Sequence, residues 1–554
     1  MEIPSLSNLK FHSVLTDECE CLCDYPISKK NWSNGRLNTD EAKEIVVQCI
    51  DNRNFIRNGA WTIVGFQDQE SSLILIRDVI GIKPMYYSHT KEYFAFSSSL
   101  NSLLTVIQDP LDLNMESLAE MLLFNKMENT KRTLIRQINE VSQGEFVRFN
   151  LRTWELKKNK YASPSFENEL SDYNEAIQRN RAQLEEYVKD QVIDTDSDNH
   201  ALLLSGGIDS SCLAHLLCPQ IPTISFYTMS YSDIQIDESK YAKAVTDQFS
   251  SVHWSKVHAS SEEFIGDVEE MHSIIEWPTF SSGTYNQFKL LQTCSKDGKK
   301  YIWDGLGADA LYGGHDYYRH CLFFEYLKHL RISAAGELLG WKENKLSELS
   351  GAFKTFGKRR IYQSKLYLRR FLDYTVELKL YNTEFLDYAL KMTDKSRFRA
   401  NTSLKQTMQD DFFEGGIRHL SRFTNRISSH FGIEMKYPFA ENMTWAEEIL
   451  SLPKEWLFMK GASKSILRDS FKNELPRLIY ERRDKKGLQS PNNQWIEDQK
   501  DFWISYFEDH MNDIYNVDYI KQHYQSLWQL GDQPENYRYF KHISFAIWRK
   551  MMNI

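Results

Sequence analysis

The sequence predicts an α/β protein in two parts, and three observations lead to this prediction. Short β-like runs separated by polar turns fill the chain up to about residue 160. Two later apolar segments, 201–204 and 300–303, each lead into a turn of small residues and then a helix-like segment. A strand, a small-residue turn and a helix in succession are typical of a parallel sheet that binds its ligand at the carboxyl edge.

The front part is predicted to form antiparallel sheets, because the β-like runs 61–66, 73–76 and 93–96 alternate with polar turns. The polar segment 158–174 contains Pro164 and is predicted to be a linker. Beyond it, helices and strands are expected to alternate, with a further strand at 223–227. We therefore expect one domain at 1–160 and a second at 175–554.

The segment from about 315 to 435 is long, aromatic and predicted to be helical. Its basic side chains could face an acidic peptide or a partner protein, or they could form the solvated face of an amphipathic helix. These basic residues are Lys358, Arg359, Arg360, Lys365, Arg369 and Arg370.

The composition is that of an ordinary globular protein. Of 554 residues, 42% are hydrophobic and 26% are charged, and the net charge of −9 argues against general nucleic-acid binding. No apolar run is long enough to cross a membrane, and the first residues lack the pattern of a signal peptide. We therefore expect a cytoplasmic protein that binds neither nucleic acid nor membrane.

Three of the eight cysteines lie close together near the start of the chain. Cys19, Cys21 and Cys23 occupy every second position, so on a strand their side chains would share one face. We interpret them as the buried side of a strand. A metal cluster is the alternative, although zinc-binding cysteines usually have spacers of two or more residues.

The most informative stretch is the turn after segment 201–204. Its glycines let backbone N–H groups approach an anion, and Asp209 suits a divalent cation held between it and phosphates. The pattern S-G-G-I-D-S resembles the pyrophosphate-binding loop of the ATP pyrophosphatases, which split ATP into AMP and pyrophosphate. The predicted ATP- and pyrophosphate-binding residues of this loop are Leu204, Ser205, Gly206, Gly207, Ile208, Asp209, Ser210 and Ser211.

A second glycine-rich turn follows segment 300–303 and adds Gly305 and Gly307 to the predicted nucleotide-binding residues. It also brings a second carboxylate, Asp309. Since both turns follow strands of one parallel sheet, Asp209 and Asp309 are predicted to hold one magnesium ion. The alternative is that Asp309 caps a helix beginning at the next residue.

Two basic segments follow near the C-terminal end, at 464–468 and 482–488. Their side chains can neutralise a leaving pyrophosphate and the charge on a reacting acyl phosphate, and we predict catalytic roles for Lys464 and Lys485. The alternative is that they are ordinary solvated surface residues.

Seven segments, in order along nearly the whole chain, resemble motifs of the asparagine synthetase family of class II amidotransferases. They are 77–87 (RDVIGIKPMYY), 94–98, 204–211, 305–314 (GLGADALYGG), 435–439, 464–468 and 483–488. The resemblance implies an N-terminal glutaminase-like αββα sandwich joined to a parallel-sheet ATP-pyrophosphatase domain with helical insertions. It also implies ATP and Mg²⁺ as cofactors of an AMP-forming amide ligase.

The departures from the family pattern concern the source of nitrogen. Glutaminases of this class use a cysteine directly after the initiator methionine, and this chain has Glu2 there. No R-G-P-D and no clear N-G-E motif for binding glutamine is found. We therefore expect a vestigial glutaminase domain that releases no glutamate from glutamine.

The second departure is Leu306, where asparagine synthetases carry a glutamate that faces the reaction intermediate. The family's β-lactam synthetases and the lasso-peptide macrolactam cyclases also lack the N-terminal cysteine, and both join an amine of the substrate itself. The resemblance favours this branch, with Leu306 in the substrate pocket and a precursor peptide as a candidate substrate. A leader-binding protein or a protease would be the partner. The alternatives are an ammonia-dependent asparagine synthetase and a non-catalytic scaffold.

Overall fold

The computed structural model describes most of the chain from residue 58 onward. The described ranges are 58–67, 71–124, 132–167, 170–192, 195–233, 236–340, 379–392, 403–483, 491, 495–496, 499–529 and 537–554. The predictions for Glu2, for the three clustered cysteines, for Lys485 and for the basic residues between 358 and 370 fall outside these ranges.

The front of the chain forms two antiparallel sheets, which confirms the prediction from its β-like runs. One sheet has the strand order β1-β2-β6-β7 and the other has the order β4-β3-β5. The strands are β1 (Thr62–Gln67), β2 (Ser72–Arg77), β3 (Tyr86–His89), β4 (Phe94–Ser97), β5 (Asn139–Glu140), β6 (Glu145–Asn150) and β7 (Leu156–Lys160).

The two sheets pack face to face through apolar side chains that alternate along their strands. Leu75 of β2 and Tyr87 of β3 are buried in the layer between the sheets. The rings of Phe94 on β4 and Phe149 on β6 stack with their centroids 4.2 Å apart. The helix α2 (Leu100–Leu104) packs on β3 and β4, so the sandwich has a helical layer on this side.

A buried ion-pair cluster joins the front sheets to the rest of the chain. Glu140 of β5 accepts hydrogen bonds from Arg77 of β2 (2.5 Å) and from Arg422 of the helix α16 (Gly416–His430; 2.9 Å). None of the three side chains is more than 5% exposed. Burial alone would favour protonated Glu140, but the guanidinium groups of Arg422 and Arg77 lower its pKa to about 2. The Arg of the 77–87 motif therefore has a structural role here.

We expect Glu140→Gln to lower the free energy of unfolding by about 3–5 kcal/mol at neutral pH, because it leaves two guanidinium groups buried without their counter-charge. The folded pKa of Glu140 lies below its ordinary value of 4.5. Its contribution is therefore complete above that value and is lost as the pH falls toward 2. Urea denaturation over the acid range measures both effects, with half-exposed Glu185→Gln as the control. Equal stability of Glu140→Gln and wild type would contradict this role.

The rest of the chain is built on a five-stranded parallel sheet with the order β10-β9-β8-β11-β12. The chain proceeds from β8 through β9 to β10 and then returns to β11 on the other side of β8. Ligands of open α/β sheets bind at such a reversal of strand order, at the carboxyl ends of the strands. The strands are β8 (His200–Leu203), β9 (Ser225–Ser230), β10 (His253–His258), β11 (Tyr301–Trp303) and β12 (Glu434–Lys436).

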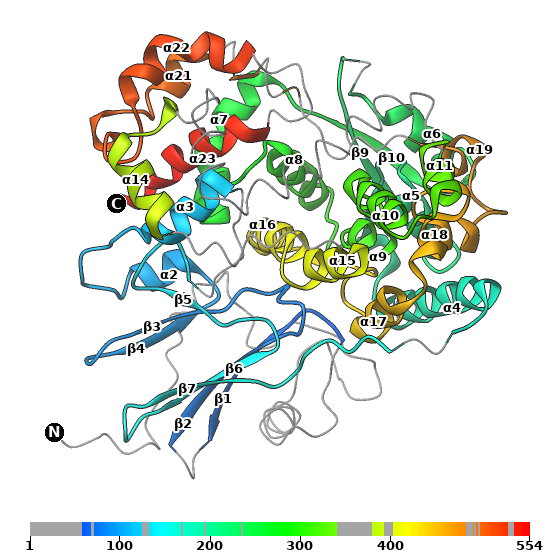
Figure 1. The fold of residues 1–554 in the computed structure, drawn as a ribbon, viewed down its shortest axis with the longest axis horizontal. Helices are drawn as coiled ribbons and strands as arrows, with labels where there is room; N and C mark the ends of the chain where they lie inside the picture. Colours follow the sequence, from blue (N-terminus) through cyan, green and yellow to red (C-terminus); the bar gives the residue numbers. More distant parts are fainter. Residues whose placement is uncertain are drawn as a thin grey trace.

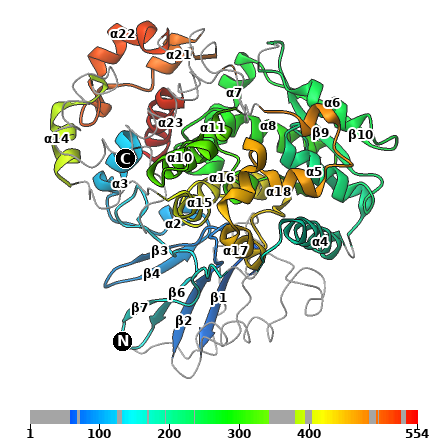
Figure 2. The same ribbon diagram turned by 45° about the vertical axis from the view of Figure 1, so that its right-hand side comes forward.

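Helices cover this sheet, and α15, α16 and α17 lie between it and the front sheets in both views (Figure 1 and Figure 2). No helix in the described ranges combines the length and apolar character needed to cross a membrane. The remaining helices are α3 (Met115–Phe124), α4 (Tyr173–Val192), α5 (Ile208–Leu217), α6 (Ser239–Thr246), α7 (Ser261–Ile275), α8 (Gly283–Lys296), α9 (Ala308–Tyr312), α10 (Asp316–Lys328), α11 (Ile332–Gly340), α14 (Thr383–Met392), α15 (Leu404–Phe413), α16 (Gly416–His430), α17 (Met443–Ser451), α18 (Ser465–Ser470), α19 (Arg477–Tyr480), α21 (Lys500–Ile504), α22 (Val517–Gln529) and α23 (Tyr537–Met552), with 3-10 helices at Ser197–Asn199, Lys454–Gly461 and Asp509–Met511.

Two local expectations differ from the structure. The segment 158–174 begins inside β7, an edge strand whose polar side chains face solvent, and it ends inside α4. The polar residues of segment 158–174 therefore belong partly to an exposed edge strand and only partly to the connection between β7 and α4. The helix α9 begins at Ala308 with Gly307 as its N-cap, so the alternative that Asp309 caps this helix is wrong.

Candidate active site

The turn after β8 is held in shape by hydrogen bonds among its own small residues. The Ser205 N–H donates to Ser210 Oγ (3.2 Å), and the Gly207 N–H donates to Ser205 Oγ (3.2 Å). The helix α5 then begins at Ile208 with no side-chain cap. The partial positive charge at its N-terminus is therefore directed at the space beyond the turn, as in anion-binding sites.

Some of the predicted loop residues shape the turns and do not face that space. Gly206 has φ +71°, and a Cβ there would lie 2.4 Å from the backbone nitrogen of Ala242. Ser211 is buried, and its hydroxyl donates to the Gly207 carbonyl (2.7 Å). Gly307 has φ +98° and packs against Phe439. These three residues allow close packing that a larger side chain would prevent.

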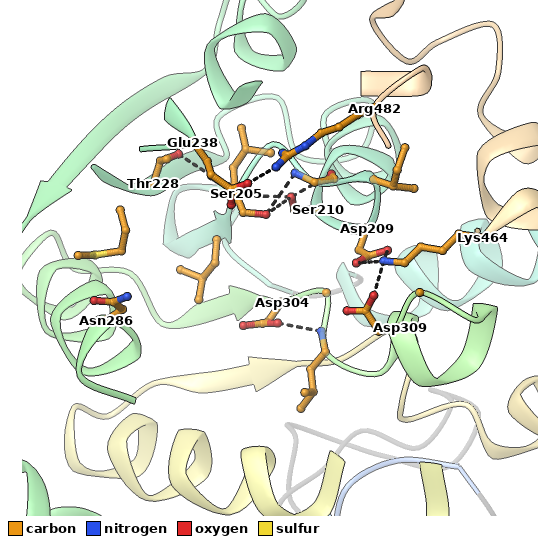
Figure 3. A pocket seen from close by; sticks show the side chains of 18 of the residues that line it. Ser205, Asp209, Ser210, Thr228, Glu238, Asn286, Asp304, Asp309, Lys464 and Arg482 are labelled. Atoms are coloured by element: carbon orange, nitrogen blue, oxygen red, sulfur yellow. Dashed lines mark hydrogen bonds and ion pairs between the residues drawn. The ribbon is translucent and has the colours of Figure 1, made fainter. Parts of the chain in front are cut away.

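Two carboxylates and one ammonium group meet at the centre of the site (Figure 3). Lys464 Nζ lies 2.5 Å from Asp209 Oδ2 and 2.8 Å from Asp309 Oδ1, and the three side chains are 7%, 17% and 20% exposed respectively. Burial lowers the pKa of Lys464, and the Asp209 carboxylate partly opposes this effect. The structure thus brings together three residues that were predicted separately.

The backbone places Lys464 with some strain. Its φ of +58° lies in the left-handed region, which is unfavourable for a residue other than glycine. The Lys464 N–H donates to the Tyr312 carbonyl at the end of α9 (3.2 Å), so α9 and the start of α18 are tied together. Asp309 and Lys464 therefore reach the site from two elements that are directly connected.

The turn after β11 carries a third carboxylate, which was not among the predicted site residues. Asp304 Oδ1 accepts the backbone N–H of Leu306 (2.8 Å), and Asp304 Oδ2 accepts the side-chain amide of Gln287 on α8 (3.2 Å). Burial raises the pKa of Asp304, and the two hydrogen bonds partly offset this effect.

These groups line one cavity of about 310 Å³, which is near the lower end of the usual range for small-molecule sites. Leu306, Leu420 of α16 and Leu290 of α8 give it apolar surface. The predicted residues that line it are Leu204, Ser205, Gly207, Ile208, Asp209, Ser210, Gly305, Leu306, Asp309 and Lys464.

The basic side chains of the cavity wall come from the C-terminal part of the chain. Arg482 forms an ion pair with Glu238 at the start of α6, and its guanidinium lies 3.9 Å from the centre of the Tyr241 ring. Arg468 donates to the carbonyls of Tyr480 (2.6 Å) and Arg482 (2.9 Å), which fixes the segment after α19 beside α18. These cations can stabilise phosphate charge at one end of the cavity.

Sequence reasoning missed Asp304, Glu238, Arg468 and Arg482 as wall residues. A signal was present for Asp304, because it is the first polar residue after the strand at 301–303. Arg468 and Arg482 belong to the two basic segments that were singled out. Nothing local marked Glu238, which joins the site through its contact with Arg482.

Comparisons with known proteins agree with this geometry. Residues 179–550 match the family model for asparagine synthase, and residues 36–162 match that for a glutamine amidotransferase domain. Asparagine synthetase [glutamine-hydrolyzing] 1 of Bacillus subtilis (strain 168) is 21% identical over 93% of this chain and 82% of its own length. Asparagine synthetase [glutamine-hydrolyzing] 2 of the same organism is 25% identical over 53% of this chain and 41% of its own length.

A solved structure, the glutamine-dependent NAD+ synthetase from Acinetobacter baumannii in complex with ADP, has a TM-score of 0.20 and 11% identity. It covers 46% of this chain and 61% of that chain, and a likeness this low adds nothing to the description of the fold.

The site combines a parallel sheet, a helix N-terminus suited to an anion, two converging carboxylates and a buried lysine. Together with the match to the asparagine synthase family model, these features define an ATP-dependent carbon–nitrogen ligase. The chain belongs to the asparagine synthase family.

Proposed function

We propose that this chain adenylates a substrate carboxylate and closes an amide with an amine of the same substrate, as a lasso-peptide macrolactam cyclase or a related enzyme does. In the first step, a carboxylate oxygen attacks the α-phosphorus of ATP, and pyrophosphate leaves. In the second, the amine nitrogen attacks the acyl carbon, AMP leaves with the electrons of the broken C–O bond, and the nitrogen gives up a proton. A precursor peptide in the cytoplasm would be the substrate, with a leader-binding protein or a protease as a partner.

Leu306 is the observation that carries this proposal. Its side chain lines the cavity next to the turn that supplies Asp309. Leucine neither holds an ammonium ion nor accepts a proton, so it does not replace the family glutamate in handling free ammonia. An amine on the same molecule as the activated carboxylate does not need an enzyme side chain to bring it into position, because the substrate itself keeps the two groups together.

The residues present also fit magnesium with ATP. Asp209 and Asp309 converge on a single cation, the Lys464 ammonium, so their oxygens are arranged to share a positive charge. Within the described residues, no three His, Cys, Asp or Glu side chains are grouped to hold a metal by themselves. Mg²⁺ commonly takes one or two protein carboxylates and completes its shell with phosphates and water. In this proposal Asp209 and Asp309 hold the ion, which would neutralise phosphate charge, and Lys464 and Lys485 stabilise the leaving groups.

The discriminating experiment supplies the substrates of the main alternative. With aspartate, ATP, magnesium and a high concentration of ammonium, we expect neither AMP nor asparagine above the rate without aspartate. The physical reason is that Leu306 gives the cavity an apolar wall, which suits a peptide or acyl chain better than aspartate, so aspartate should not be adenylated. Leu306 also offers no carboxylate to orient ammonia and take its proton in the second step. AMP is measured by chromatography and asparagine by mass spectrometry.

The positive control is a linear peptide substrate of the kind that the proposal requires, with which AMP should form and the peptide should lose one water. Robust asparagine formation would overturn the proposal in favour of an ammonia-dependent asparagine synthetase. Absence of ATP binding altogether would favour the non-catalytic scaffold.

A further inference from the structure

Five carboxylates line the cavity, and one of them differs from the rest in its partners. Asp209 and Asp309 pair with Lys464, Glu238 pairs with Arg482, and Asp316 lies 4.0 Å from Arg319. The remaining one, Asp304, has only neutral partners in the described part of the chain: the Leu306 N–H and the Gln287 amide.

This difference leaves Asp304 without a positively charged partner among the described residues. Each of its oxygens accepts one hydrogen bond from the protein, whereas a carboxylate offers about four acceptor positions in total. The remaining acceptor capacity can serve a ligand. A partly buried carboxylate with neutral partners gains most from a bound cation, since the surroundings screen the attraction less than bulk water does.

The location of Asp304 identifies the kind of cation. In Figure 3 it lies between Asp309 and Asn286 of α8, and Arg482 lies on the opposite side of the cavity. Leu306 stands two residues further along the same turn, and Leu290 and Leu420 also line the cavity. A carboxylate beside apolar side chains suits an ammonium group at the end of an apolar chain.

From this arrangement we infer that Asp304 binds and orients the amine of the substrate, and that the substrate carries this amine on an apolar segment without a second carboxylate nearby. The inference rests on the proposed function, because it assigns the second substrate group of the same site. A free dicarboxylic amino acid would place its own negative charge near Asp304, and like charges repel.

The experiment uses the full chain loaded with AMP and measures the binding of n-hexylamine by calorimetry. Hexylamine is protonated at neutral pH, and 1-hexanol is its uncharged match in size. We expect hexylamine to bind at least about tenfold more tightly than 1-hexanol, as a charge-assisted hydrogen bond predicts. Asp304→Asn should remove this difference, and Asp316→Asn, on the same cavity but 60% exposed, should preserve it.

The outcomes separate this inference from the proposed function. Equal binding of hexylamine and 1-hexanol to the wild-type chain would overturn the inference without any variant, and so would an unchanged preference in Asp304→Asn. If Asp304→Asn weakens AMP binding as much as amine binding, Asp304 belongs to the nucleotide site and the inference is wrong. If the wild-type chain binds neither AMP nor ATP, the proposed function itself fails, and the assignment of Asp304 fails with it.

Discussion

Asp209→Asn and Asp309→Asn should each reduce AMP formation about a hundredfold to a thousandfold with any substrate that the wild-type chain accepts. Through the magnesium ion that it holds, each carboxylate is expected to stabilise the charge on the reacting phosphates in the transition state by about 3–4 kcal/mol. Both side chains contact the same ammonium group, so neither is simply a surface carboxylate. The amide keeps the shape of each side chain, removes its charge and replaces one acceptor oxygen by an N–H donor. AMP release is followed at saturating ATP.

A second readout tests the metal without turnover. In the wild-type chain, ATP should bind more tightly with magnesium than without it, because the two carboxylates otherwise repel the phosphates. Each Asn variant should lose much of this dependence. Asp316→Asn is the matched control, since Asp316 lines the same cavity with a side chain that is 60% exposed. Near wild-type rates and unchanged magnesium dependence in either site variant would remove that residue from the metal site.

The sequence predicts that Asp209 and Asp309 lie close together, for a simple reason. Both follow short apolar strands, and the carboxyl ends of parallel strands lie at one edge of a sheet. The structure adds that β8 and β11 are direct neighbours, so the two turns flank the reversal of strand order. No local pattern gives that neighbour relation, because β9 and β10 and their helices intervene in the chain.

Lys464 was predicted because basic side chains can neutralise a leaving pyrophosphate and because segment 464–468 resembles a family motif. It lies 255 residues from Asp209, and a lysine in a short basic segment otherwise resembles any surface residue. Its burial depends on a left-handed backbone conformation at the start of α18, which side-chain type does not predict. Arg482 and Glu238 are 244 residues apart in the sequence and come into contact only in the folded chain. Long-range pairing of this kind depends on how whole elements pack.

For Leu306 and Asp304, the sequence shows which residue stands at each position of the turn, but it does not show which way the side chain points. The sequence placed Leu306 at the position of the family glutamate, and the structure puts it on the cavity wall. Asp304 stands two residues earlier in the same turn, where a carboxylate could equally face solvent. Its hydrogen bond to Gln287 of α8 requires α8 to lie beside β11, which only the packing of the sheet determines.

Gly314→Ala should also reduce AMP formation about a hundredfold while the chain stays folded. A Cβ at this position would lie 2.0 Å from Asp309 Oδ1 and 2.3 Å from Lys464 Cε, so both side chains must move. The conflicting atoms are near the ends of side chains, and these can shift without unfolding the backbone around them. A displacement of about 1 Å in a group that holds the reacting phosphates is enough for a loss of this size.

The comparison with Gly336→Ala separates this effect from a general cost of replacing glycine. Gly336 lies in α11, and a Cβ there would meet no atom within 4 Å. Both variants should show thermal unfolding close to that of the wild-type chain, and only Gly314→Ala should lose AMP formation and the magnesium dependence of ATP binding. If Gly314→Ala kept full activity, the Lys464 cluster could not be the arrangement that acts on ATP. If it unfolded instead, Gly314 would be required by the packing of α9 against α18, and the cluster would need testing through Asp209 and Asp309 alone.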